Sequence, residues 1–256
     1  MKPEYFTAEN SIVRQIWGNA DTILFIFAGA SAEFALNKAV DWLYFTGKLP
    51  ADPLGRLFST VGYARMIVFA EKTAAEKSID AMAAIHSNVE AKRGMRIPDW
   101  AYRDVLFMLI DYSIRSFEVL ERKLTQTEKA EVFDVFNRVG TRMGLKGLPD
   151  NFTDWQKMRL EHLRENLERS HYTEDLFRQY RKHLGFVRYQ ILREVQILIA
   201  PVEVKQDLSR QKTSFVKRLI ALYKSSRLIH ADGLLKDMIL PPKYKNQIKA
   251  LNISGR

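Results

Sequence analysis

The sequence predicts an all-α protein, a multi-helix bundle, for three reasons. Glycine (12) and proline (8) are scarce among 256 residues and fall mostly between long stretches of helix-forming residues. Apolar residues recur at spacings of three and four, and no segment shows the alternation of a strand series. With 46% hydrophobic residues, the chain can bury a substantial core. We expect one helical domain over residues 1–256.

The first two expected helices follow from apolar length and from capping. Ile23–Leu36 is the most apolar stretch. It is shorter than the about 20 residues of a membrane span and contains Glu33, so we expect a buried core helix. Asp52 followed by Pro53 marks the next start, because aspartate caps a helix and proline suits its first position. This helix should reach about Glu71.

The middle of the chain repeats such start and stop signals. Thr73 and Glu76 have the spacing of a capping box, which predicts a helix from there to about Lys92, before Gly94. A long amphipathic helix should follow Pro98, because apolar residues recur there at helical spacing.

The second half contains two further helix starts and one short joint. Thr125 and Glu128 again have capping-box spacing, and Thr153 with Gln156 restarts a helix. The loop between them, 144–151, is the strongest candidate for a subdomain joint, but its length favours one continuous domain. Later helical patterns cover 184–199 and 214–228, and Pro241-Pro242 is a stop.

Composition and missing motifs exclude several classes of site. Without cysteine there can be no disulfide, iron–sulfur cluster, thiolate-ligated haem or cysteine zinc site. Neither glycine-rich nucleotide loop, G-x-G-x-x-G or G-x-x-x-x-G-K-[ST], occurs. A serine nucleophile in a G-x-S-x-G elbow is also missing. Histidine, carboxylates, lysine and tyrosine remain as metal ligands.

The net charge of +10 is concentrated at the C-terminal end. Residues 178–256 contain 17 Lys/Arg against 5 Asp/Glu, whereas the preceding part is nearly balanced. Such a basic part is suited to an anionic membrane, nucleic acid or an acidic partner, although a solvated helical face is the simpler interpretation. We expect no nucleic-acid partner. Residues 1–10 carry Glu4 and Glu9 and lack the pattern of a signal peptide, so we expect a cytoplasmic protein, either free or peripheral to a membrane.

Two residues stand out as candidates for chemistry. His86 lies on an apolar stripe with Ile79, Met82 and Val89, at helical spacing. It is either a core histidine hydrogen-bonded to a carbonyl or hydroxyl, or the proximal ligand of a haem. Arg56 shares a helix face with Thr60 in a segment that should be buried. A buried guanidinium needs an anion, which is either a carboxylate, such as Asp52 or Asp111, or a haem propionate.

These residues belong to a pattern that resembles a known family. The run Asp52-Pro53-Leu54-Gly55-Arg56-Leu57-Phe58-Ser59-Thr60, followed by Ala84-Ile85-His86-Ser87-Asn88-Val89, is similar to the signature of the rubber oxygenase catalytic-domain family. That family includes the latex clearing proteins and the membrane-bound oxygenases of mycophenolic acid biosynthesis. The later Leu124–Glu128, Gly144–Pro149, Leu198–Pro201 and Leu240–Pro242 also resemble its pattern, so the likeness covers roughly 23–244.

The resemblance implies an all-α bundle that encloses a haem b pocket, with His86 as the iron ligand and Arg56 and Thr60 at polar, catalytic positions. The implied activity is an oxygenase that uses dioxygen on a small hydrophobic, unsaturated or lipid-like substrate. A non-catalytic haem-binding or haem-sensing protein and a haem-free helical adaptor are the alternatives. The sequence departs from the pattern at Ser59, where latex clearing proteins can carry lysine, and at 35–39, where an apolar-proline turn is replaced. Polyisoprene is therefore not the expected substrate.

Overall fold

The structure is a computed structural model that describes residues 3–208. Its regular structure is α-helical, with two isolated bridges, Tyr5–Glu71 and Asn37–Leu167, in place of strands. The expectation of an all-α protein is confirmed for this part of the chain. The helices are α1 (Ile12–Trp17), α2 (Ala20–Leu36), α3 (Val40–Phe45), α4 (Lys48–Ala51), α5 (Pro53–Val68), α6 (Lys72–Arg93), α7 (Asp99–Leu120), α8 (Gln126–Arg142), α9 (Phe152–Glu165), α10 (His171–Ile199) and α11 (Val202–Leu208).

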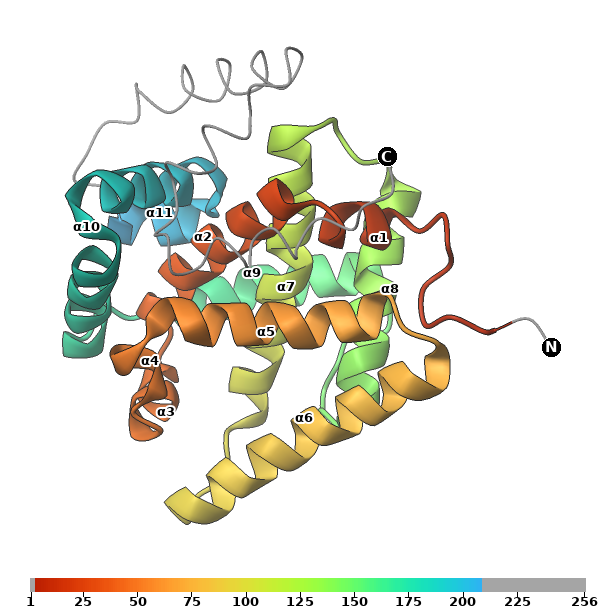
Figure 1. Cartoon of the computed structure of the whole chain (residues 1–256), viewed down its shortest axis with the longest axis horizontal. Coiled ribbons are helices and arrows are strands. Elements are labelled where there is room, and N and C mark those ends of the chain that lie inside the picture. Colours follow the sequence, from red (N-terminus) through yellow and green to blue (C-terminus); the bar gives the residue numbers. More distant parts are fainter. Residues whose placement is uncertain (1–2, 209–256) are drawn as a thin grey trace.

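Helix α2 forms the centre of the bundle, as its apolar sequence predicts. It packs against α7 on one side and α10 on another (Figure 1). Gly29 permits this close packing, because a Cβ atom there would lie 2.2 Å from the ring of Tyr112. The predicted buried core helix is therefore confirmed. None of the helices among residues 3–208 combines the length and the hydropathy that a membrane span needs.

A buried charge network joins α2 to α7 and α9. Arg159 donates to both carboxylate oxygens of Glu33, at 2.6 and 2.7 Å, and to Asp111 at 3.1 Å. Tyr112 donates its hydroxyl to Glu33 at 2.9 Å. These side chains are almost completely buried, so each charge depends on its partner. The Glu33 charge that interrupts the apolar stretch of α2 is therefore paired. It shares the guanidinium of Arg159 with a second carboxylate, that of Asp111.

A second buried polar cluster ties α9 to α7. Nδ1 of His162 lies 2.5 Å from Oδ1 of Asp104, and the amides of Asn37 and Asn166 donate to the other oxygen of that carboxylate. Both histidine and carboxylate are buried. This histidine thus has a complete structural explanation.

Helices α5 and α6 leave their shared turn as an open V, with α3 and α4 on the open side (Figure 1). Asp52 caps α5 as predicted, accepting the Gly55 amide at 3.0 Å. The predicted capping box of α6 is wrong: the helix begins at Lys72, and Thr73 lies inside it. The N-terminal segment replaces the cap, because the Glu4 carbonyl accepts the Lys72 amide at 2.7 Å.

The caps of the later helices were partly predicted. Thr125 and Glu128 form the expected capping box, and Gly94 ends α6 in the left-handed conformation. The helix restart expected at Thr153 and Gln156 is found, but it begins slightly earlier, because Asn151 caps α9 through its own side chain. Residues 184–199 form only the second part of α10. The predicted helix at 214–228, the stop at 241–242 and most of the basic part lie outside the described residues.

Candidate functional site

The α5–α6 pair brings together the two residues that the sequence singles out. Arg56 lies on the first turn of α5, and His86 lies in the second half of α6. The charge of Arg56 contributes to lowering the pKa of His86, so the two groups are close enough to interact electrostatically. At the far end of α6, Arg93 pairs with Asp41 at 2.5 Å and lies over the ring of Trp42, which fixes this helix to α3.

His86 is partly buried, and one of its ring nitrogens has no hydrogen-bond partner. Nδ1 is inaccessible to solvent and forms no hydrogen bond of normal geometry with residues 3–208. The Met82 carbonyl, one turn earlier, interacts with the imidazole and raises the pKa of His86. Burial is the largest effect and lowers the pKa, which favours the neutral imidazole. A neutral ring with an unused lone pair is what a metal ligand requires.

Two residues beyond the predicted set support the imidazole. The ring of Tyr102, on α7, meets His86 edge-on, with centroids 5.3 Å apart. The Tyr102 hydroxyl donates to Glu90 at 3.1 Å, and burial together with this carboxylate raises the pKa of Tyr102. Glu90 follows His86 by one helical turn and raises its pKa. Sequence spacing contains a signal for Glu90, because residues four apart share a helix face. The contact with Tyr102 depends on tertiary packing.

Arg56 forms a local hydrogen-bond network with Ser59 and Thr60 of the same helix. Its Nη1 donates to Ser59 Oγ at 3.1 Å and to Thr60 Oγ1 at 3.2 Å. Both hydroxyls donate in turn to the Arg56 carbonyl. The shared helix face of Arg56 and Thr60 is confirmed. Burial lowers the pKa of Arg56, so the guanidinium is held in partly desolvated surroundings.

No carboxylate neutralises Arg56 within the described part of the chain. Of the two candidates that the sequence offers, Asp52 caps the third residue of α5, and Asp111 pairs with Arg115 and Arg159 instead. The guanidinium therefore retains donors for an external anion.

His86 and Arg56 have the chemistry to hold a haem. A neutral imidazole can bind iron through one nitrogen, and an arginine without a carboxylate partner is available to a propionate. Across residues 3–208, no three or more His, Asp or Glu side chains gather into a metal site. His86 is thus a single donor, as an axial haem ligand would be.

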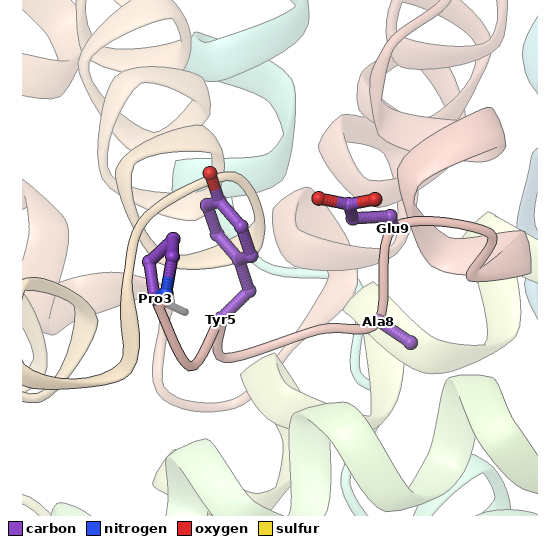
Figure 2. Close-up of a pocket in the computed structure, with 4 residues that line it drawn as sticks. All are labelled: Pro3, Tyr5, Ala8 and Glu9. Carbon is purple, nitrogen blue, oxygen red and sulfur yellow. The ribbon is translucent and has the colours of Figure 1, made fainter. Parts of the chain in front are cut away.

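One surface pocket lies elsewhere on the molecule. It is lined by Pro3, Tyr5, Ala8 and Glu9 (Figure 2). Tyr5 bridges to Glu71 at the start of α6, and His86 lies 15 residues further along, about 22 Å away at 1.5 Å per residue. This pocket therefore takes no part in the candidate site. The enclosed haem pocket that the resemblance implies stays a prediction.

Comparison with known proteins gives one match. The family model described as ER-bound oxygenase mpaB/B'/Rubber oxygenase, catalytic domain, matches residues 15–222. The match spans Arg56, Thr60 and His86 and extends over most of the chain. No curated protein and no solved structure matches significantly.

Proposed function

This chain belongs to the ER-bound oxygenase mpaB/B'/rubber oxygenase catalytic-domain family, and from that premise we propose that it is a haem b-dependent oxygenase. Membership supports an oxygenase-type catalytic domain and enzymatic activity in general. The proposal adds the cofactor, its ligand and the kind of substrate. In it, His86 ligates the iron, and Arg56 and Thr60 form the polar part of the pocket.

The unpaired Nδ1 of the His86 ring is the observation that carries the proposal. Buried polar atoms are normally paired, and a core histidine would use a carbonyl, a hydroxyl or a carboxylate. His162 in this protein does so, with Asp104 at 2.5 Å. The His86 ring is half-buried and has a lowered pKa, and its Nδ1 has no such partner in normal hydrogen-bond geometry. These properties support the assignment of His86 as a ligand rather than as a structural histidine.

Each residue has a definite role in the proposed site. His86 would bind the iron through one nitrogen, and the N–H of the other nitrogen would face the Met82 carbonyl, which raises the pKa of the ring. Arg56 supplies a positive charge for a propionate, and Thr60 holds the guanidinium through its hydroxyl. Haem iron, when bound, supplies the dioxygen chemistry that side chains lack.

The proposed substrate is a small unsaturated or lipid-like molecule, with dioxygen as the second reactant. Large apolar side chains exposed on the helices of the site support this class. Ile85 adjoins His86 and is 45% exposed, and Met66 of α5 is 49% exposed. Such side chains favour contact with an apolar molecule over a charged one.

Titration of the purified full-length protein with haem b, followed by absorption spectroscopy, tests the proposal. We expect saturation at one haem per chain and a Soret band typical of histidine ligation. Oxygen consumption by the loaded protein with unsaturated fatty acids or isoprenoids then tests catalysis. Haem binding without substrate-dependent oxygen uptake would favour a haem-binding or haem-sensing protein. Failure to bind haem would overturn the proposal.

A further inference from the structure

Helix α10 bends sharply at Gly185. This residue has φ 74° and ψ 170°, a conformation outside the helical region that glycine adopts without strain. The helix is therefore two arms that meet at an angle (Figure 1). Leu176 and Leu184 anchor the first arm in the core, and Ile199 anchors the second. The bend between them is held in place from both sides.

Two consecutive apolar side chains project into solvent directly after the bend. Phe186 is 60% exposed and Val187 is 68% exposed. Single exposed apolar residues are ordinary on protein surfaces. An adjacent aromatic and β-branched pair at a rigid corner is a small apolar patch, and such patches mark contact sites.

Positive charge surrounds this pair. Arg181 lies over the ring of Phe186, with 5.6 Å between the guanidinium carbon and the ring centroid. Arg181 and Lys182 are exposed, and neither forms an ion pair within residues 3–208. The sequence from 176 to 193 contains five Lys/Arg and no Asp or Glu. The corner of α10, which we define as residues 181–188, therefore combines exposed cations with an apolar tip.

We propose that the corner of α10 docks on an anionic lipid bilayer. Phe186 and Val187 would enter the interface between headgroups and acyl chains, while Arg181 and Lys182 contact lipid phosphates. Interfacial helices have the same arrangement. Their apolar side chains insert into the bilayer interface, and neighbouring cations are attracted to anionic headgroups. Nucleic acid would use the cations but leave the apolar pair in water. The proposal is independent of haem and places the attachment at a defined part of the basic region.

Flotation with lipid vesicles tests this docking on the full-length protein. Vesicles of phosphatidylcholine alone are compared with vesicles that contain phosphatidylserine, at low and at physiological salt. We expect binding to the anionic vesicles, weakened by salt. Phe186→Ser/Val187→Ser should lower the partition coefficient at least about tenfold. Arg181→Glu/Lys182→Glu should lower it about 30-fold or more, because each cation near the surface contributes roughly fivefold.

Matched controls separate the corner from general surface properties. Met95→Ser removes an equally exposed apolar side chain, at 60%, from the α6–α7 turn. Lys77→Glu/Lys92→Glu on α6 changes the net charge by the same amount as the corner pair. Both controls should retain binding. Equal loss in the controls, or no preference for anionic vesicles, would overturn the proposal. So would a change in sedimentation of Phe186→Ser/Val187→Ser with unaltered vesicle binding, because the pair would then serve self-association.

Discussion

The ring of Tyr102 meets the imidazole of His86 edge-on, with 5.3 Å between the ring centroids and 89° between the planes. The Tyr102 hydroxyl donates to Oε1 of Glu90 at 3.1 Å, and the same oxygen accepts the Ile97 amide at 2.9 Å. Tyr102 belongs to α7, whereas His86 and Glu90 belong to α6. The carboxylate thus holds the tyrosine, and the tyrosine restricts the imidazole. The orientation of the proposed ligand depends on the packing of α7.

Replacing Glu90 by Gln should lower the pKa of His86 further, because the carboxylate raises that pKa while burial lowers it. Histidine resonances of the haem-free protein, followed by NMR against pH, give this pKa directly. Asp80→Asn is the control, since Asp80 is on α6 but exposed and paired with Arg142. Equal shifts in both variants would contradict a specific effect of Glu90.

The lowered pKa of His86 also makes the stability of the fold depend on pH. The folded state releases its proton at a lower pH than the unfolded chain, whose histidine titrates near 6.5. The unfolded state therefore binds more protons as the pH falls below about 6.5, and stability decreases there. Above that pH the contribution is fully present. Denaturant unfolding of His86→Leu should show a weaker loss of stability between about pH 6.5 and the lower folded pKa.

His86→Ala should abolish tight haem binding. The substitution removes the one imidazole of the candidate site, and burial of the porphyrin alone leaves the iron without its ligand. Haem content after gel filtration and the position of the Soret band measure this. His171→Ala is the matched control, because His171 is exposed at the start of α10 and its ring contacts that of Tyr172 at a tilt. Full haem occupancy with an unchanged band in His86→Ala would exclude His86 as the ligand.

Arg56→Leu should weaken haem retention, since the guanidinium has no carboxylate partner and is the proposed partner of a propionate. A loss of about tenfold in affinity corresponds to one charge-assisted hydrogen bond of about 1.4 kcal/mol. Arg56→Lys should restore part of it, because lysine keeps the charge without the planar fork. Arg65→Leu provides the control on the same helix, where burial also lowers the arginine pKa. Unaltered haem affinity in Arg56→Leu would exclude a role in the pocket.

The features that sequence predicts well here are local. The start of α5 at Asp52-Pro53, the capping box of α8 and the end of α6 at Gly94 each depend on a few neighbouring residues. The start of α6 was misassigned because its cap comes from Glu4, 68 residues earlier. The spacing of neighbouring residues contains no information about a capping partner so far away in the sequence.

The candidate site shows the same division. The shared face of Arg56 and Thr60 follows from helical periodicity, and Arg56 lies close enough to influence His86 electrostatically. The contact of Tyr102 with His86 does not follow from helical spacing, because it depends on the packing of α7 on α6. Periodicity defines helix faces, whereas long-range packing decides which faces meet.

Glu33→Gln should be strongly destabilising, because it leaves Arg159 buried with one carboxylate instead of two. Breaking a buried ion pair by removing one partner costs about 3–5 kcal/mol. Urea or guanidinium unfolding measures the loss. Glu161→Gln on α9, an exposed glutamate, should change the free energy of unfolding by less than about 0.5 kcal/mol. Similar effects of both substitutions would show that the network does not contribute as its geometry indicates.

Ser59 leads to a prediction about access to the proposed haem. Its hydroxyl accepts from Arg56 and donates back to the Arg56 carbonyl at 2.9 Å, so it is engaged with its own helix. A serine is also too short to arch over a haem, whereas a lysine at the same position has three more bonds of reach. We therefore expect imidazole to bind the ferric protein, and carbon monoxide the reduced protein, without first displacing an amine.

Ser59→Lys should slow that binding and make it dependent on pH, since a neutral lysine amine would compete for the iron. Stopped-flow absorption with imidazole and with carbon monoxide measures both rates. Ser78→Lys is the matched control, because Ser78 is partly exposed on α6 and its hydroxyl also donates to a carbonyl of its own helix, that of Ala74, at 3.0 Å. That control should bind as fast as the natural protein. Slow, pH-gated binding in the natural protein that Ser59→Lys leaves unchanged would mean that another side chain already covers the iron, and the open site would be excluded.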